Sequence, residues 1–536
     1  MNRLHIDRNL PTAGTRKKIF HRGIVLSCSL ALGLAGCNKD LVKADQPNSK
    51  EFRLELPAET TTIIRGLENG DSIKAQISIP GQPGGYDTAA YSYVWTSLRN
   101  QDTLGTRHFL TFRNFAKQDP TLISCLLTVT DKKSGIIKQA TTSVFVTTAT
   151  REGWVLLGDK SGASQLSVLT YTAQGYKKFV DIGAGLGIHV PLTGKPVSIN
   201  SIGSDMPYGL SLYQWMGITT DQGITILNSM DFSVNQSVGN YLNQVMPPSP
   251  ATPVRFNMSG SSGFVGTRGP DVYHFGFFYM AYFGMFNFKK LNSYPPGVPG
   301  APAFNASPNH SFFGTKISAE QNRILYDEDS CEFVRARVSS GNLNINGLLP
   351  LQLPFSKKGC KLKAIHSKLT EENEDEITAF LYNPTTEAGY LIEFLSNGIV
   401  KRTTSIAATD ARDIAASSFI EIDNNTGYLI YVKGNEVKAY DYKIGQTLSL
   451  LSFDNEKISL VKMERYLPTS SRVPGRLELY EQLYKRLVVC TYDPANPDTS
   501  GTFRLYQLLL GHQPPLMEVK ETGFPKIVDA TFNPIP

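Results

Sequence analysis

The chain has 536 residues, of which 41% are hydrophobic, 19% are charged and 10% are aromatic, and its formal net charge is +6. This composition excludes a disordered chain and a coiled coil, and the length predicts two or three domains, or one large repeat domain beside a small one. Most of the net charge lies in residues 1–36, and the remainder is close to neutral. A near-neutral body argues against a nucleic-acid partner, because phosphate binding needs a basic surface.

The N-terminal residues predict a lipoprotein signal peptide over residues 1–36. A basic segment that ends at Arg22 precedes a short apolar run from Gly23 to Gly36, too short to span a bilayer comfortably. The residues Leu34-Ala35-Gly36-Cys37 match the bacterial lipobox, in which the cysteine sulfur receives diacylglycerol. We therefore expect cleavage before Cys37 and anchoring in the outer membrane through its lipid. An ordinary secretory signal with an incidental cysteine is the alternative.

Residues 37–50 are polar and contain Pro47, so we expect a flexible tether. The Lys39-Asp40 pair weakly resembles the Lys-acidic export signal of surface lipoproteins in Bacteroidota. The expected location is therefore the outer membrane, with the body exposed at the cell surface.

Residues 51–150 predict a β-sandwich, because short alternating segments follow one another with turn residues between them. In Tyr91–Trp95, the period of two places three aromatic rings on one face, and Trp95 is the expected core anchor. The expected strands are Phe52–Leu56, Thr60–Ile64, Ser72–Ile79, Tyr91–Trp95, Leu122–Thr130 and Thr142–Thr148.

Residues 151–536 repeat a unit of strand, turn and strand, with Gly, Asn or Asp in the turn. Recurrent hairpins without a convincing helix predict a β-propeller-like domain of seven or eight blades, and a large multi-sandwich is the alternative. The hairpins that carry this prediction begin at Gly153, Tyr213, Tyr390, Tyr428 and Arg486.

Residues 247–302 depart from this theme and are expected to form an insertion or an extended blade edge. Within them, Tyr273–Phe288 holds nine aromatic residues in sixteen, and a Pro-rich stretch follows at 293–303. One interpretation is an inner strand that is covered on both faces. The other is that some rings reach the surface and contact a ligand or a transporter, because exposed aromatic clusters mark interaction surfaces. The candidates are Tyr273, Phe275, Phe278, Tyr279, Tyr282 and Phe286.

Candidate catalytic groups are sparse. The sequence contains no HExxH, GxSxG or phosphate-binding glycine loop, and no histidines at metal-ligand spacing. Carboxylates cluster at Glu371–Glu376 and at Asp327–Asp329, where solvated turns are expected and calcium binding is the lesser alternative. Cys331 and Cys360 can pair across a hairpin, or both can stay reduced. We therefore expect no catalytic residue, no metal and no cofactor.

Four features together resemble the PKD-like family lipoproteins of Bacteroidota: the lipobox, Tyr91-x-Tyr93-x-Trp95, Leu127-x-Val129-x-Asp131 and Gly153-Trp154-x-Leu156-Leu157. The resemblance spans nearly the whole mature chain. It implies an all-β fold, with a PKD/Ig-like β-sandwich followed by a β-propeller-like domain.

The same resemblance implies a surface accessory protein that works beside a Sus-type outer-membrane transporter and its substrate-capturing lipoprotein. Such a protein binds glycan or peptide and assists nutrient uptake. The alternative is a surface polysaccharide- or peptide-active enzyme with a propeller catalytic domain. The family supplies no catalytic residues that could be transferred to this chain.

Overall fold

The structure is a computed structural model in which two compact units are distinguished, Met1–Leu54 with Gln76–Thr88 and Glu55–Ala75 with Ala89–Pro536. It describes residues 52–56, 61–65, 72–78, 87–111, 113, 121–150, 152–172, 175–202, 215–229, 231–258, 263–276, 287–294, 300–309, 320–339, 345–351, 357–369, 375–464, 476–483 and 485–534. The short strand β1 (Arg53–Glu55) pairs with β4 (Gln76–Ser78), and Phe52 and Ile77 are buried.

The second unit begins with a small all-β module. Its five-stranded sheet has the order β2–β9–β8–β5–β6, and a two-stranded sheet pairs β3 with β7. Trp95 in β5 is fully buried and its Nε1 donates a hydrogen bond to the Arg107 carbonyl oxygen at 2.8 Å, as expected of a core anchor. The bounds are β2 Thr61–Arg65, β3 Ser72–Lys74, β5 Tyr91–Ser97, β6 Thr103–Gly105, β7 Phe109–Thr111, β8 Thr121–Asp131 and β9 Ile137–Thr148.

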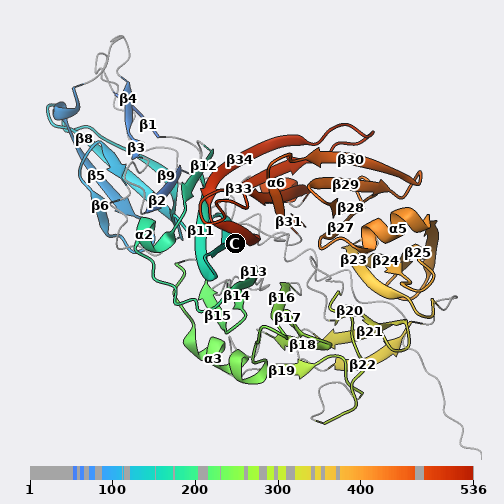
Figure 1. The fold of residues 1–536 in the computed structure, drawn as a ribbon. Coiled ribbons are helices and arrows are strands. Elements are labelled where there is room, and N and C mark those ends of the chain that lie inside the picture. The colour runs from blue at the N-terminus through green and yellow to red at the C-terminus, as the bar shows by residue number, and fades with distance from the viewer. Residues whose placement is uncertain are drawn as a thin grey trace, which may run out of the picture. The chain divides into compact units, whose positions relative to one another are not determined.

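From Gly153 onward, the described residues form seven antiparallel sheets that follow one another along the chain (Figure 1). The first four sheets are β12–β11–β10–β35 (Gly175–Phe179, Ala163–Thr172, Gly153–Lys160, Lys526–Asn533), β13–β14–β15 (Pro196–Ile202, Trp215–Thr220, Ile224–Asn228), β16–β17–β18–β19 (Val254–Met258, Gly263–Arg268, Asp271–Gly276, Asn287–Lys290) and β20–β21–β22 (Glu320–Asp327, Glu332–Ser339, Ile345–Pro350). The other three are β23–β24–β25–β26 (Lys361–Leu369, Asp375–Tyr382, Gly389–Leu395, Val400–Ile406), β27–β28–β29–β30 (Ile420–Asp423, Tyr428–Lys433, Glu436–Asp441, Gln446–Ser452) and β31–β32–β33–β34 (Lys457–Met463, Arg486–Tyr492, Gly501–Gln507, Leu516–Phe524).

The last strand of the chain completes the first sheet. β35 pairs with β10 in antiparallel register, with Asn533 opposite Gly153 and Lys526 opposite Asp159. This closure fits a β-propeller-like fold, because it joins the two ends of a series of sheets within one sheet. The expected all-β class with a propeller-like domain is confirmed at this level.

Buried apolar clusters lie between consecutive sheets, and they follow from the alternation of side chains along each strand. In β24, Ala379 and Leu381 pack toward the sheet that contains Phe333, whereas Phe380 between them packs toward the sheet that contains Leu429. A further cluster joins Trp154 in the first sheet to residues of the seventh. Each sheet is therefore covered on both faces, and the series of packed sheets closes on itself.

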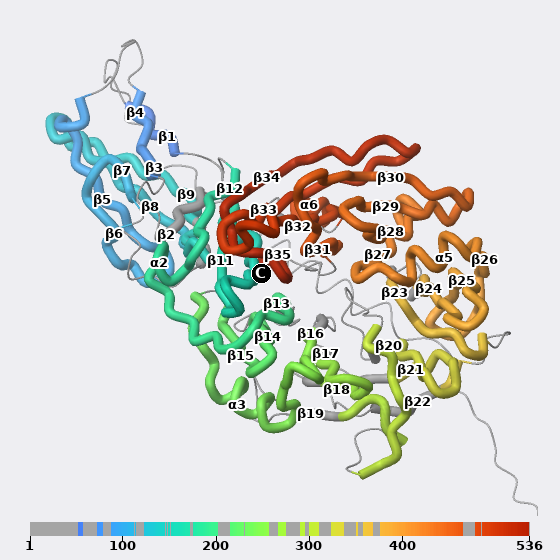
Figure 2. Tube along the Cα trace, in the orientation of Figure 1, coloured from blue at the N-terminus to red at the C-terminus, as the bar shows by residue number. Residues whose placement is uncertain are grey.

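Hairpins form at the predicted places, although Tyr213, the expected start of one of them, lies outside the described residues. The strands β28 and β29 flank Gly434, whose φ of 65° is unfavourable for residues with a Cβ. The strands β16 to β19, within the segment 247–302 that was expected to be an insertion or an extended blade edge, form a four-stranded sheet of the series (Figure 2).

The expectation of no convincing helix is wrong. In α3, the Asn235 side chain accepts a hydrogen bond from the Val238 amide, and the apolar residues Val238 and Leu242 are buried one turn apart. This spacing is present in the sequence, but the segment is short and the hairpins around it dominate the pattern. The helices are η2 Thr88–Ala90 (a 3₁₀ turn), α2 Ile182–Leu186, α3 Gln236–Val245, α5 Ala408–Ala415 and α6 Arg476–Leu483.

Candidate functional site

A hollow of about 550 Å³ is formed by residues of three consecutive sheets and of the segment that connects two of them. We call it the three-sheet hollow. Because it collects side chains from distant parts of the sequence, it is the strongest candidate site in the described residues. Its lining residues are Ala251, Thr252, Pro253, Arg255, Thr267, Gly269, Pro270, Asn305, Ala306, Pro308, Asn309, Glu328, Lys361, Leu362 and Lys363.

The connecting segment 300–309 is fixed by alternate burial. Phe304 and Ala306 are buried in an apolar cluster with Val272 and Leu325, so Asn305 between them is exposed. The backbone holds the same arrangement: the Ala306 amide donates to the Pro270 carbonyl oxygen at 3.3 Å. Asn305 is thus presented by a segment that is packed on its neighbours.

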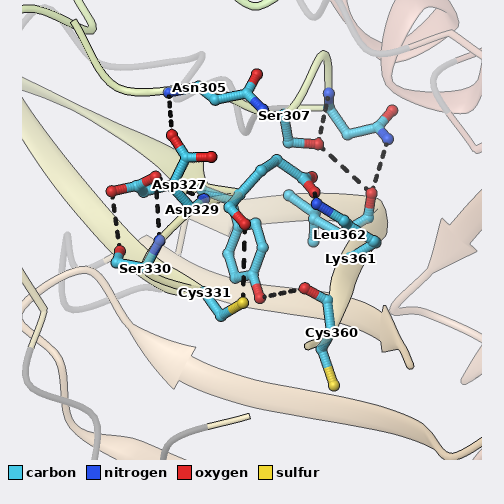
Figure 3. A network of polar contacts seen from close by, with 12 residues as sticks. Asn305, Ser307, Asp327, Asp329, Ser330, Cys331, Cys360, Lys361 and Leu362 are labelled. Atoms are coloured by element: carbon cyan, nitrogen blue, oxygen red, sulfur yellow. Dashed lines mark hydrogen bonds and ion pairs between the residues drawn. The ribbon is translucent and has the colours of Figure 1, made fainter. Parts of the chain in front are cut away.

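Side-chain hydrogen bonds attach this segment to the sheets on either side (Figure 3). The Ser307 hydroxyl donates to the Leu362 carbonyl oxygen at 3.4 Å, and the Asn309 Nδ2 donates to the same oxygen at 3.2 Å. On the other side, the backbone N–H of Asn305 donates to the Asp329 carboxylate at 3.2 Å. Hydrogen bonds therefore connect the wall of the hollow to β23 on one side and to the turn between β20 and β21 on the other.

That turn supplies the one carboxylate among the lining residues, Glu328. Its Oε2 lies 2.8 Å from the Lys361 Nζ, and this hydrogen bond raises the pKa of the Lys361 ammonium group. The Glu328 side chain is 11% exposed, whereas that of Lys361 is 47% exposed. The opposite charges of Glu328 and Lys361 compensate each other, so this pair adds no net charge to the hollow.

Three other polar side chains of the lining are unengaged. Within the described residues, Arg255, Asn305 and Lys363 make no side-chain hydrogen bond or ion pair with another residue. They come from β16, from the connecting segment and from β23. A guanidinium, an amide and an ammonium group are thus available together at one concave surface.

A β-bulge in β23 determines the position of Lys363. Leu362 lies opposite Leu381 and Ala364 lies opposite Phe380, so Lys363 is an extra residue without a partner in β24. Register shifts occur at similar places in β13 and β31, where the extra residues are Val197 and Ser459. The bulge therefore recurs in the first strands, in chain order, of three of the sheets. Of the three bulged residues, only the one at this hollow is a lysine.

The sequence-predicted aromatic site is only partly described. Tyr273 in β18 is 9% exposed and packs in an apolar cluster with Trp215 and Phe256, while its hydroxyl donates to Asp271 at 3.2 Å. The backbone of Phe275 lies opposite Phe264 in β17 and Phe288 in β19. Phe278, Tyr279, Tyr282, Phe286 and the lipidation candidate Cys37 lie outside the described residues.

Of the two carboxylate clusters, Asp327–Asp329 lies at the turn after β20, and Asp375 and Glu376 begin β24, while Glu371–Glu374 lie outside the described residues. Asp327 accepts a hydrogen bond from the Ser330 hydroxyl at 2.9 Å, and Glu376 pairs with Lys401 at 3.2 Å. In the part of the chain that the structure describes, no group of three or more His, Cys, Asp or Glu side chains could hold a metal ion. Cys331 and Cys360 carry free thiols beside one buried cluster.

A second hollow of about 340 Å³ is lined by Trp215, Asn228 and residues 233–237. It lies at the start of α3 and has no charged residue in its lining. Separately, the helices of the described residues are all too short or too polar to cross a membrane.

No protein-family model matches the chain, and no curated protein matches it. Solved structures that are similar to the chain have low sequence identity. A quinoprotein alcohol dehydrogenase-like protein of Bacteroides thetaiotaomicron is 10% identical, over 89% of this chain and 97% of that one, with a TM-score of 0.39. Dipeptidyl peptidase 4 of Porphyromonas gingivalis is 9% identical, over 71% of this chain and 55% of that one, with a TM-score of 0.34.

A calcium-binding protein of Agrobacterium tumefaciens, regucalcin, is 10% identical over 54% of this chain and 85% of that one, with a TM-score of 0.27. Similarities at this level assign neither a ligand nor an activity to this chain. The class therefore follows from strand order and packing: an all-β, β-propeller-like protein with an open hollow between consecutive sheets.

Proposed function

We propose that this chain is a lipid-anchored protein of the outer membrane that binds a glycan or peptide at the cell surface, and that the three-sheet hollow is the binding site. The observation that carries the proposal is the set of unengaged side chains, Arg255, Asn305 and Lys363, around one concave surface. Polar side chains that could be satisfied elsewhere but remain available in a preformed hollow are typical of ligand sites.

The location in this proposal comes from the lipobox at Leu34–Cys37 and the polar tether behind it. A lipid on Cys37 would hold the body at a membrane surface while the tether lets it turn. At the membrane surface, the protein would transfer its bound ligand to a Sus-type transporter and the substrate-capturing lipoprotein beside it. The resemblance to PKD-like family lipoproteins supports this role.

We also infer the finer architecture. The seven sheets from β10 to β35 would be the blades of a seven-bladed propeller, with β35 closing the first blade. The module with Trp95 would be a PKD/Ig-like sandwich. The rings of Tyr279 and Tyr282 stay candidate contacts for a ligand or transporter.

The test is binding by the full-length protein purified in detergent. It is titrated calorimetrically with neutral glycans, acidic glycans and short peptides. In the Ala251→Trp variant, an indole enters the hollow from an exposed lining position, and we expect at least about a tenfold loss of affinity. The matched control, Ala495→Trp, changes an exposed alanine in a turn far along the chain and should bind as the parent does.

Two results would contradict the proposal. One is that no member of the panel binds, and the other is that Ala251→Trp binds like Ala495→Trp. Incubation of the same panel with the protein, followed by product analysis, tests the enzyme alternative. Turnover that is lost on changing a single carboxylate would replace the binding role by catalysis.

A further inference from the structure

We infer that the three-sheet hollow recognises glycans through the carboxylate groups of uronic acid units; this inference rests on the proposed function and names its ligand class. It begins from the charge of the lining. Arg255, Lys361 and Lys363 are cationic, and Glu328 is the one acid among the lining residues. Because Glu328 pairs with Lys361 at 2.8 Å, two positive charges remain uncompensated.

The other acids near the hollow do not line it. Asp329 accepts a hydrogen bond from the backbone N–H of Asn305 at 3.2 Å, and Asp327 accepts from the Ser330 hydroxyl. Asp271 pairs with Lys290 at 2.5 Å and accepts from the Tyr273 hydroxyl. The lining therefore offers a ligand two cations, Arg255 and Lys363, that make no ion pair with a carboxylate of the described residues.

The two cations match a carboxylate in different ways. The guanidinium of Arg255 can donate two parallel hydrogen bonds to one carboxylate, whereas the ammonium of Lys363 acts as a compact charge. Arg255 extends from β16 of one sheet, and Lys363 extends from the bulge of β23 two sheets later. Because both strands are parts of packed sheets, little backbone ordering is needed when a ligand binds.

The remaining lining favours a sugar over a peptide as the carrier of the carboxylate. Each sugar hydroxyl both donates and accepts a hydrogen bond, and the unengaged side-chain amide of Asn305 offers both functions. Pro253, Pro270 and Pro308 add rigid apolar surface for the C–H groups of a sugar ring. An acidic peptide shares only the carboxylate and is an outcome that the test must separate.

The experiment compares ligands that differ only in charge. Oligogalacturonate, oligoalginate and hyaluronan oligosaccharides are titrated into the detergent-purified full-length protein, each beside its carboxyl-reduced counterpart. We expect at least one uronate series to bind about tenfold or more tightly than its reduced counterpart, and to weaken as salt is raised. Arg255→Gln and Lys363→Gln should each remove most of this preference, whereas Arg99→Gln, an exposed arginine in β5's neighbouring turn, should retain it.

Thermal melting of each variant checks that it is folded, and the comparison of ligand pairs does not depend on any variant. Equal binding of uronate and reduced glycans, or parental uronate binding by both hollow variants, overturns this inference and leaves the proposed binding role intact. Binding of acidic peptides without any uronate overturns the glycan class. If no glycan and no peptide binds, both the inference and the proposed function fail.

Discussion

At the scale of single residues, the carboxylate of Asp529 connects its own strand, β35, to β13 and to β31. Its Oδ2 accepts a hydrogen bond from the Ile199 amide of β13 at 2.9 Å, and its Oδ1 accepts one from the Lys462 Nζ of β31 at 3.1 Å. Burial alone would lower the pKa of Lys462, but the carboxylates around it, Asp529 first and then Glu464, more than offset this, so the pKa is raised. The Lys462 ammonium group is therefore charged at neutral pH, and its contact with Asp529 joins the sheets near both ends of the series.

We expect Asp529→Ala to lower the free energy of unfolding by about 3 kcal/mol, because it leaves the Lys462 ammonium without its partner in a largely buried place. Denaturant unfolding of the purified protein measures this cost. Asp413→Ala is the matched control, since Asp413 pairs with Lys433 at an exposed position and should cost at most about 1 kcal/mol. A similar decrease in the free energy of unfolding in the two variants would show that the buried pair stabilises the fold no more than an exposed pair does.

Sequence reasoning found the residues whose role is set locally and missed those whose role is set by the fold. Trp95 could be predicted as a core anchor, because it shares one strand face with two other aromatic residues. Arg255, Asn305 and Lys363 are each an ordinary polar residue in sequence, far apart along the chain. Only the packing of three sheets brings them to one hollow, and no local pattern indicates that.

At the scale of elements, hairpins could be predicted because a turn and its two strands are adjacent in sequence. The positive φ angles of Gly398 and Gly434 explain why glycine marks two of those turns. The pairing of β35 with β10 could not be predicted in this way, since the partners lie at opposite ends of the domain. Neither could the bulge that presents Lys363, because it depends on the register between β23 and β24.

At this scale, we predict that the fold depends on the closing strand β35. Removing residues 526–536 exposes the pairing edge of β10 and removes Ile527 and Phe532 from the cluster around Trp154. We expect the shortened protein to lose cooperative unfolding, or to melt at least about 10 °C lower, because one whole sheet edge and its packing are gone. Circular dichroism melting measures this.

A chain that lacks only residues 535–536 is the control, since β35 ends at Asn533, and it should melt as the parent does. Full retention of stability in the longer deletion would mean that the closing strand contributes little to the fold.

At the scale of the whole molecule, the all-β class followed from composition and hairpin spacing, and the packing of consecutive sheets explains why it forms. Strands whose two faces are both buried, as in β24, need a covering layer on each side, and in this molecule the neighbouring sheets supply both layers. The proposed membrane anchor is a prediction from the sequence of residues 34–37.

The anchor is tested by metabolic labelling with an alkyne analogue of palmitate. We expect the parent protein to be labelled and to fractionate with the outer membrane, because the lipobox cysteine receives the lipid. The Cys37→Ser variant should be unlabelled and retain its uncleaved signal. Equal labelling of parent and variant would refute lipidation at Cys37, and Cys331→Ser serves as the control for a thiol in the body.

The claim that the three-sheet hollow is the ligand site is tested most directly by hydrogen–deuterium exchange. The full-length protein is compared alone and saturated with the tightest-binding member of the glycan and peptide panel. A ligand in the hollow should slow exchange in residues 251–256, 266–270, 305–309 and 361–364, because bound ligand suppresses local opening of the backbone that it contacts. Exchange that slows only in other segments, such as the sheet from β31 to β34, would contradict the account.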